Sequence, residues 1–457
     1  MKLSRFNIWV KDYPQAGDYL LFNSRTQALI RISSQFKAEL DAFVSGAAAA
    51  SCVQVSQNSA ALRKNGIIVE DEQEEQEKLD DFFRQLKHES CGLSFETTIL
   101  TTYSCNFKCV YCFEEQVKEN VFLNAETSGL IVNWLIHKAK EGKFRTIHLV
   151  YYGGEPLLNP APIYNISRKL FAWAQDEGIK FGFSIISNGS LITPQLVGRL
   201  LSVGLKEIRV TIDGDRQAHN LKRPFLDGSG SFDAIINNIK KVIDKVNIGI
   251  AGNFDRQSFA SIPRLLDYLE EEGVLYQLSS INFAPIVPRL GPKSDPGAIE
   301  LVECGSFIGK EGMFKETIAL KKELIRRGLK ISTGLAVNAC PLFMQSAGVT
   351  IDPKGVLYKC NSLLGHPEFS VGNVRNKAYN EKSREFFELD AWKKCPADCA
   401  YVPMCQGGCR FFSYVENGNF TDLSCKRDYF DYIIPELIKL EYEKLKTEAV
   451  PAAAKAV

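Results

Sequence analysis

Tyr103-Ser-Cys-Asn-Phe-Lys-Cys-Val-Tyr-Cys-Phe113 places three thiols, Cys105, Cys109 and Cys112, in one short loop. The apolar, β-branched run over residues 97–102 before it predicts a strand. Disulfide pairing would leave one of the three thiols over, and a tetrahedral zinc site or a complete iron-sulfur cluster takes four protein ligands. Three thiolates in one loop therefore suggest a cubane cluster with one iron left open to another ligand.

The C-x3-C-x2-C spacing, with Tyr111 directly before the last cysteine, resembles the cluster loop of radical S-adenosylmethionine (SAM) enzymes. The resemblance implies that the methionine amino and carboxylate groups of SAM chelate the open iron of a 4Fe-4S cluster. It further implies that an electron from this cluster cleaves the sulfonium and gives a 5′-deoxyadenosyl radical.

Alternating strands and helices from about residue 95 to 290 agree with this resemblance. Six β-α units predict an α/β fold, a partial (β/α)6 TIM-like barrel, whose chemistry lies at the C-terminal ends of the strands. Strands are expected at 97–102, 146–152, 181–187, 207–213, 246–251 and 278–285, and helices at 125–140, 163–175, 194–203, 232–241 and 262–271.

Polar motifs follow the second, third and fourth of these strands. The Gly-Gly-Glu sequence that begins at Gly153 resembles the family's motif for the SAM amino group, because glycines let backbone approach a ligand and a carboxylate accepts from ammonium. Thr211 and Asp213 resemble the positions that contact the SAM ribose. The SAM contacts implied by the resemblance are Tyr111, Gly153, Gly154, Glu155, Ser187, Asn188, Thr211, Asp213 and Arg223.

The segment from His219 to Arg223 also has a counterpart in relatives, which carry a histidine and an arginine here. Arg223 can pair with the SAM carboxylate as a charged fork. The family usually has aspartate after the histidine, where this chain has Asn220. His219 is open to two interpretations, a catalytic group or a satisfied residue that holds the loop, and no catalytic residue is assigned.

Seven cysteines in the C-terminal third resemble the SPASM extension of radical SAM enzymes, which houses two auxiliary 4Fe-4S clusters. The quartet opens with C-x3-C, one residue longer than the family's common C-x2-C. The resemblance assigns Cys395, Cys399, Cys405 and Cys425 to one auxiliary cluster and Cys340, Cys360 and Cys409 to the other.

The set of Cys340, Cys360 and Cys409 is one ligand short, so its open iron could bind substrate. A distant thiol, Cys304 or Cys91, is the alternative fourth ligand. Cys52 is expected to be a small buried hydrophobe.

Residues 1 to about 70 predict a small winged-helix-like module. Two short strands are expected within 19–32, then a helix capped by Ser33 or Ser34, a helix over 58–64 and a strand over 66–70. The module resembles the recognition domain of enzymes that modify ribosomally made peptides, where a leader peptide adds a strand to the sheet edge. A packing domain without a ligand is the alternative. The acidic run 71–81 is expected to be a solvated helical face or linker.

These expectations divide the chain into five segments. They are a leader-recognition-like domain (1–75), a linker helix (76–94), the partial barrel (95–305), a SPASM domain with two auxiliary clusters (306–435), and a C-terminal helix with a disordered tail (436–457).

The composition of the chain argues against two classes of partner, nucleic acids and membranes. The net charge is +1 and no basic block stands out, so no nucleic-acid partner is expected. No apolar run approaches the roughly 18 residues of a membrane span, so no membrane partner is expected. Charges interrupt the N-terminus where a signal peptide would have its apolar core. Thirteen cysteines in clustered spacings indicate metal ligation in the reducing cytoplasm.

The resemblance as a whole implies a radical SAM/SPASM peptide maturase that acts on a precursor peptide with a leader and takes electrons from a flavodoxin- or ferredoxin-like reductant. Our first hypothesis is a thioether cross-link between a substrate cysteine and a carbon radical. The alternatives are formylglycine formation, as in anaerobic sulfatase maturation, and carbon-carbon or carbon-oxygen cross-linking. A non-enzymatic electron carrier is a further class, but it would not need Gly153, Gly154, Glu155 or Asp213.

Overall fold

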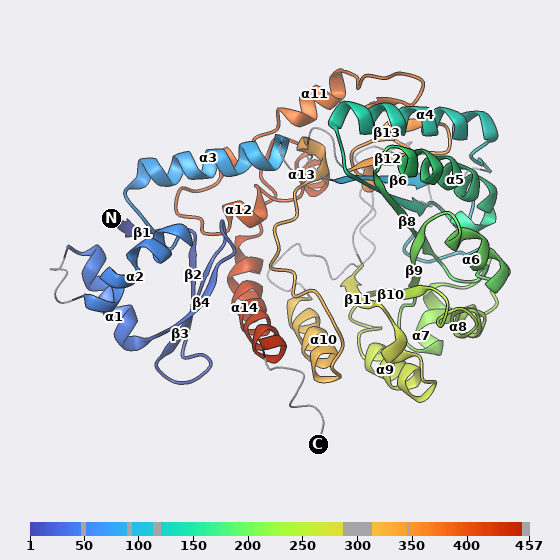
Figure 1. Ribbon diagram of the computed structural model, residues 1–457. Coiled ribbons are helices and arrows are strands. Elements are labelled where there is room, and N and C mark those ends of the chain that lie inside the picture. Colours follow the sequence, from blue (N-terminus) through green and yellow to red (C-terminus); the bar gives the residue numbers. More distant parts are fainter. Residues whose placement is uncertain (47–51, 89–93, 113–119, 287–312, 345–347, 450–457) are drawn as a thin grey trace.

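The computed structural model describes residues 1–46, 52–88, 94–112, 120–286, 313–344 and 348–449. An N-terminal unit and a curved sheet wrapped by helices lie on opposite sides of a cysteine-rich C-terminal part (Figure 1). One hydrophobic core joins the sheet to the C-terminal part, and a second joins the C-terminal part to the N-terminal unit. In the described ranges no helix combines the length and apolar character that a membrane span needs.

The curved sheet contains the six parallel strands predicted from the sequence. They are β6 (Ser94–Leu100), β7 (Thr146–Tyr152), β8 (Lys180–Ser187), β9 (Leu205–Thr211), β10 (Asn247–Phe254) and β11 (Ser280–Pro285). In β7 the buried side chains Ile147, Leu149 and Tyr151 alternate with partly exposed ones, as period-2 patterning requires. β9 ends at Thr211, two residues earlier than predicted, and β10 extends three residues further than predicted.

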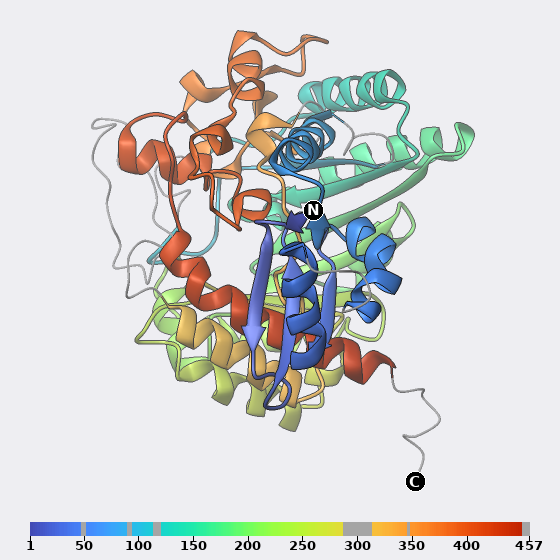
Figure 2. The ribbon, with the colours of Figure 1, turned by 90° about the vertical axis from the view of Figure 1, so that its left-hand side faces the viewer.

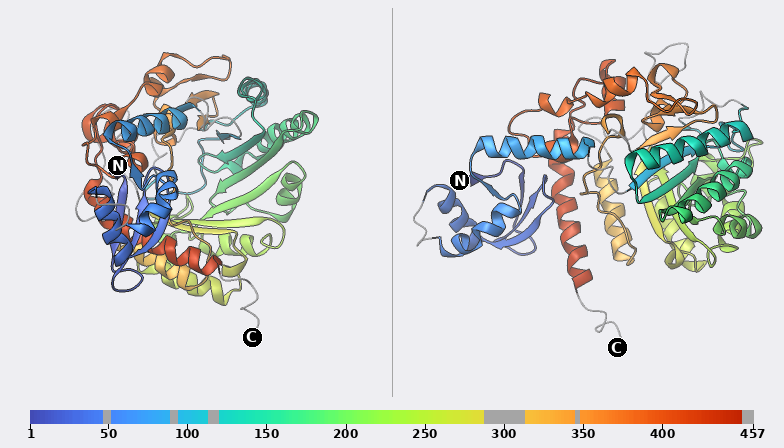
Figure 3. Two further views of the ribbon diagram at one scale, coloured as in Figure 1. Left: turned by 60° about the vertical axis from the view of Figure 1, so that its left-hand side comes forward. Right: turned by 45° about the horizontal axis from the view of Figure 1, so that its top comes forward.

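Helices cover the convex side of this sheet (Figure 3). They are α4 (Ala125–Gly142), α5 (Pro160–Asp176), α6 (Pro194–Leu201), α7 (Arg216–Lys222), α8 (Phe232–Lys240) and α9 (Ser261–Glu271). Helix α7 is the one that the sequence analysis did not predict, and Asp215 caps it by accepting from the Ala218 N–H at 2.9 Å. Since the strands are parallel, the loops after β6, β7, β8, β9 and β10 lie together at one edge.

The sheet continues into the C-terminal part, past the boundary predicted at residue 305. Its order is β11-β10-β9-β8-β7-β6-β12-β13-β14. Strand β12 (Val349–Ile351) pairs parallel to β6, and β13 (Val356–Tyr358) and β14 (Gly372–Asn373) follow antiparallel. The Tyr103 hydroxyl donates to Asp352 at 2.9 Å, which ties the loop after β6 to the turn after β12.

The N-terminal unit is built on an antiparallel sheet, β2-β3-β4. Its elements are β1 (Lys2–Leu3), β2 (Asn7–Lys11), β3 (Asp18–Asn23), β4 (Leu29–Ser33), α1 (Ser34–Val44), α2 (Val53–Lys64) and β5 (Ile68–Val69). Strands β3 and β4 and both helices were predicted. Strand β2 was missed, and α2 begins five residues earlier than expected. Ser33 caps α1 by accepting the Phe36 N–H at 3.1 Å.

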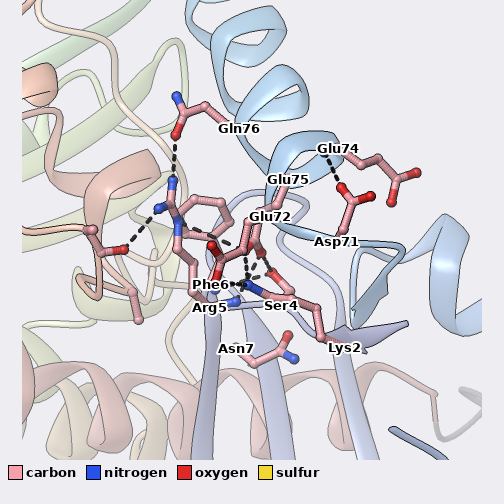
Figure 4. Close-up of polar contacts among 12 residues, drawn as sticks. Lys2, Ser4, Arg5, Phe6, Asn7, Asp71, Glu72, Glu74, Glu75 and Gln76 are labelled. Atoms are coloured by element: carbon pink, nitrogen blue, oxygen red, sulfur yellow. Dashed lines mark hydrogen bonds and ion pairs between the residues drawn. The ribbon is translucent and has the colours of Figure 1, made fainter. Parts of the chain in front are cut away.

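The acidic run forms α3 (Glu72–His88), but its inner face is buried, contrary to the expected solvated helix or linker. Glu75 is 2% exposed and accepts from the Ser4 hydroxyl at 2.6 Å and the Arg5 N–H at 3.0 Å (Figure 4). Leu79 and Phe83 on the same helix are also buried. Helix α3 therefore packs on the N-terminal unit through one buried face. This face was not predicted, because the apolar side chains that recur at helical spacing are separated by many charged residues.

The C-terminal part supplies the surface on which the N-terminal sheet packs. Its helices are α10 (Phe314–Arg326), α11 (Glu381–Phe387), α12 (Val402–Cys405), α13 (Arg410–Asn417) and α14 (Arg427–Ala449). Figure 2 shows the N-terminal sheet in front of α14. Ile8 and Val10 of β2 share a core with Ile434 and Ile438 of α14 and with the cysteine loop at Cys399.

Candidate active site

The loop after β6 is fixed by a short backbone ladder with residues 222–226. Lys108 N–H donates to Pro224 O and Val110 N–H to Lys222 O, both at 3.0 Å, and Leu226 N–H donates to Asn106 O at 3.1 Å. Beneath this ladder Phe107 is fully buried and meets Phe225 edge-to-face at 4.9 Å. The ladder thus holds the segment that carries Cys105 and Cys109 against residues 222–226.

Cys105, Cys109 and Cys112 all line one cavity of about 260 Å³, close to the lower end of the size range of small-molecule sites. Burial raises the pKa of the Cys105 thiol to about 12, and the charges of Glu155, Cys109 and Cys112 act in the same direction. The Cys105 thiol is therefore protonated until a metal replaces its proton.

Seven of the nine SAM contacts implied by the sequence line the same cavity. They are Tyr111, Gly153, Gly154, Ser187, Asn188, Thr211 and Arg223. Gly153 and Gly154 press against the cysteine loop, where a Cβ would lie 2.4 Å from Thr102 O and 2.3 Å from Ser104 O. Only glycine allows this approach, so the pair forms a cradle of bare backbone beside the thiols.

Glu155 and Asp213 lie behind the cavity wall. Glu155 is fully buried and accepts from Ser187 Oγ at 2.8 Å, Asn188 N–H at 2.7 Å and Leu157 N–H at 3.0 Å. Burial raises the pKa of Glu155 while these three donors oppose the rise. In this structure Glu155 braces the loop that presents Ser187 and Asn188 to the cavity.

Asp213 belongs to a buried network around the Tyr111 hydroxyl. That hydroxyl donates to Asp213 and accepts from Arg223 Nη1 at 2.8 Å and Asn253 Nδ2 at 3.2 Å. The Asn253 N–H donates to Asp213 at 2.7 Å. Thr211 thus faces the cavity, while Asp213 positions Tyr111 and Arg223. Asn253 lines the cavity too and was missed, although a polar residue near the C-terminal end of a barrel strand was the available signal.

His219 is fully buried and hydrogen-bonded through both ring nitrogens. Nδ1 accepts the Asp213 N–H at 3.2 Å, so Nε2 carries the proton toward Ser231 Oγ at 3.0 Å. Ser231 Oγ donates in turn to Arg223 O at 2.6 Å. Of the two interpretations of His219, the structure shows the satisfied residue that holds the loop between Asp213 and Arg223.

His219 gives the fold a specific pH dependence. Burial lowers its pKa from 6.5 to about 3, so the unfolded chain binds more protons between these values. The contribution of His219 to the free energy of unfolding is therefore fully present above pH 6.5. Below pH 6.5 this contribution falls by about 1.4 kcal/mol for each unit of decreasing pH. Between pH 7.5 and 5, we expect the free energy of unfolding to decrease by about 2 kcal/mol less in His219→Gln than in wild type, because glutamine takes up no proton. Denaturant unfolding at both pH values measures it, and an unchanged pH slope in the variant would contradict it.

The other cysteines gather in the two groups that the sequence implies. Cys340 has its pKa raised to about 12, first by burial and then by the charges of Cys360 and Cys409. Cys405 has its pKa raised to about 12 by burial and then by its three partners in the quartet. The quartet Cys395, Cys399, Cys405 and Cys425 lines a second, small cavity.

No group of three or more His, Cys, Asp or Glu side chains in the described ranges is arranged to hold a metal ion. Cys304 and Cys91 lie outside the described residues. Cys52 is fully buried among apolar side chains of the N-terminal unit.

Comparison with known proteins places this site in a family context. Residues 99–269 match the Radical SAM superfamily. The chain is 28% identical to an Fe-coproporphyrin III synthase of Methanosarcina barkeri, over 70% of this chain and 84% of that protein. It is 22% identical to a cysteine-type anaerobic sulfatase-maturating enzyme of Clostridium novyi, over 67% of this chain and 85% of that protein.

Two solved structures show the extent of the fold. The chain is similar to anSMEcpe with bound AdoMet, with TM-score 0.60 and 19% identity, over 77% of this chain and 99% of that one. It is also similar to Streptococcus suis SuiB bound to precursor peptide SuiA, with TM-score 0.51 and 13% identity, over 93% of this chain and 99% of that one. These likenesses confirm the predicted fold class.

Proposed function

We propose that this radical SAM enzyme, whose relatives include peptide maturases of the SPASM type, joins a cysteine sulfur to a carbon of a ribosomally made precursor peptide. The observation that carries the proposal is the cavity in which three thiols face the Gly153–Gly154 cradle. A peptide substrate is supported by the N-terminal unit and by the 93% of the chain that resembles SuiB, a protein solved with its precursor peptide.

The residues around the cavity fit the cofactors. A 4Fe-4S cluster on Cys105, Cys109 and Cys112 with SAM would supply hydrogen abstraction from an unactivated carbon. The backbone of Gly153 and Gly154 would take the SAM amino group, and Arg223 would take its carboxylate. Thr211, Asn188 and Asn253 place hydroxyl and amide groups in the cavity for the nucleoside.

The thioether is supported by the ligand count of the auxiliary groups. The quartet is complete, whereas Cys340, Cys360 and Cys409 supply three thiols, so we propose that a substrate thiolate takes the fourth position of that cluster. This arrangement would hold the sulfur ready for bond formation to carbon. Each cross-link would remove two hydrogens from the peptide: one as a hydrogen atom to the SAM-derived radical and one as the thiol proton, with the remaining electron passing to the auxiliary cluster.

The edge of β4 is the proposed docking strand for the leader. The Asn23 N–H donates to Ala28 O at 2.9 Å, and the register pairs Leu20 with Arg31. The alternation of an antiparallel ladder then turns the Leu29 and Arg31 N–H groups away from β3. At the opposite edge, the Asn7 N–H of β2 is already bound to Ser4 O at 3.2 Å. β4 is therefore the edge more open to an added strand.

Arg31→Pro is expected to weaken leader binding at least tenfold, because it removes a donor to the incoming strand without breaking the ladder to β3. Arg31→Ala, which keeps the N–H, is the matched control and should bind like wild type. Anisotropy of a labelled leader peptide measures both affinities, after thermal unfolding shows that both variants fold. Equal affinities of the proline and alanine variants would rule out strand addition at β4.

Other functions remain distinguishable by experiment. One relative is named for a porphyrin product and one for sulfatase maturation, so residue identity alone does not choose the substrate. The match to SuiB extends over more of the chain than the match to anSMEcpe, by about the size of the N-terminal unit, and favours a leader-bearing peptide. Carbon-carbon or carbon-oxygen cross-linking would use the same cavity. An electron carrier would not need the cradle.

The deciding experiment uses the full chain, reconstituted with iron and sulfide without oxygen and reduced with dithionite. Release of 5′-deoxyadenosine from SAM separates the enzyme from an electron carrier. Co-expression with a short cysteine-rich precursor encoded nearby, followed by mass spectrometry, tests the thioether: each link lowers the mass by two hydrogens and blocks one thiol from alkylation. We further propose that the protein works in the reducing cytoplasm with a flavodoxin- or ferredoxin-like reductant.

A further inference from the structure

Arg410 is a fully buried cation in the loop between the two auxiliary thiol groups. It follows Cys409 directly and begins α13. Its guanidinium donates to Phe420 O at 2.8 Å, Asp422 O at 2.7 Å and Gly408 O at 3.1 Å, and also to Gly407 O. These carbonyls belong to the segments that present Cys405, Cys409 and Cys425, so the side chain fastens the ligand loops together.

No carboxylate among the described residues forms an ion pair with Arg410. Side-chain hydrogen bonds and then the charge of Arg410 lower the pKa of the Asp422 carboxyl, but this carboxylate is half exposed and pairs with Lys394 at 3.0 Å. A half-exposed carboxylate and carbonyl dipoles compensate a fully buried cation only in part. Arg410 therefore needs anions nearby.

The thiolates of the two auxiliary groups would supply such anions once they bind iron. The charge of Arg410 acts on Cys340 and Cys409 of the three-thiol set and on Cys395 and Cys405 of the quartet. Lys426 is a second cation near Cys405 and Cys409. Arg410 is thus placed to serve both groups at once.

We propose that Arg410 is the shared counter-cation of the two auxiliary clusters and raises the reduction potential of both. It is a positioning residue, and the inference rests on the proposed function because it assumes that both groups hold clusters. Net charge and hydrogen bonds to the sulfurs set the potential of an iron-sulfur cluster. A buried cation stabilises the reduced form, which carries one more negative charge, and does so strongly because water does not screen it.

The test is an EPR-monitored redox titration of the reconstituted full chain, in wild type and in Arg410→Gln. The variant should lower both auxiliary potentials by at least 59 mV, a tenfold shift of a one-electron equilibrium. The potential of the cluster at Cys105, Cys109 and Cys112 should not move and is the internal reference. Arg384→Gln is the control, because Arg384 is 68% exposed and pairs with Glu381 at 3.0 Å, so that water screens its charge from both groups of thiols.

Arg410→Lys keeps the test decisive if Arg410→Gln fails to hold iron. Retention of both auxiliary clusters at wild-type potentials by the lysine variant would support the proposal, since charge is then what the site requires. Unchanged potentials in Arg410→Gln, a shift of one auxiliary cluster alone, or equal loss of iron from the glutamine and lysine variants would overturn it. If reconstituted wild-type protein binds only enough iron for one cluster, the two auxiliary clusters of the proposed function do not exist. This outcome differs from those that overturn the role of Arg410.

Discussion

Cys105→Ala is expected to reduce the release of 5′-deoxyadenosine from SAM to the level of a protein-free control. Cys105 is one of three thiols that line the cavity beside the Gly153–Gly154 cradle. Two remaining thiols cannot hold a cubane that leaves only one iron for SAM. The measurement is chromatography of the nucleoside after incubation of the reduced, reconstituted chain with SAM.

Cys52→Ala is the matched control for this prediction. Cys52 is fully buried in the core of the N-terminal unit and belongs to none of the three thiol groups. Its replacement removes one buried sulfur, for a loss of about 1 kcal/mol in the free energy of unfolding, and should leave nucleoside release intact. Undiminished release from Cys105→Ala would remove the basis of the proposed function.

The second large effect is expected from Gly154→Ala. A Cβ at this position would lie 2.3 Å from Ser104 O, 2.6 Å from Ser104 C and 2.7 Å from Tyr103 O, all of them backbone atoms of the cysteine loop. Backbone cannot rotate aside as a side chain can, so the loop must move. We expect a loss of about 3 kcal/mol in the free energy of unfolding and at least tenfold weaker SAM binding.

Gly129→Ala distinguishes this steric effect from a general effect of adding a methyl group. Gly129 lies inside α4, and a Cβ there would meet nothing within 4 Å. Alanine should stabilise that helix by about 0.5–1 kcal/mol and leave SAM binding unchanged. Calorimetry of SAM binding and denaturant unfolding measure both variants. Wild-type SAM affinity in Gly154→Ala would show that the cradle does not need its close approach.

The parts of the fold that the sequence predicted are those with local signals. Strands such as β7 show period-2 patterning, and the cysteine spacings indicated the groups that the structure brings together. Strand β2 was missed because no turn signal was recognised between it and β3. The buried face of α3 was missed because Glu75 lies in a run of eleven mostly charged residues and does not stand out in the sequence. Its partners Ser4 and Arg5 are some seventy positions away.

The arrangement of the site depended on contacts between distant segments. The bond between Tyr103 and Asp352 joins residues 249 positions apart, and nothing in either segment signals it. Asp213 and Glu155 were expected as ligand contacts, which stays a prediction, and in the structure both hydrogen-bond to neighbouring side chains. A carboxylate in a motif indicates that it has a hydrogen-bond partner. The sequence does not show whether this partner is a ligand or a neighbouring loop, because that depends on how distant segments pack.

The N-terminal sheet shares a core with the quartet loop and therefore covers the place where we propose an auxiliary cluster. Arg5 donates to Ala397 O at 2.9 Å and Ser24 donates to Ala400 O, both within the segment between Cys395 and Cys405. A chain truncated before residue 76 would expose that segment to water and oxygen. Loss of activity on truncation would then report cofactor damage as much as lost recognition, so single substitutions at the β4 edge are the cleaner probe of how a substrate is chosen.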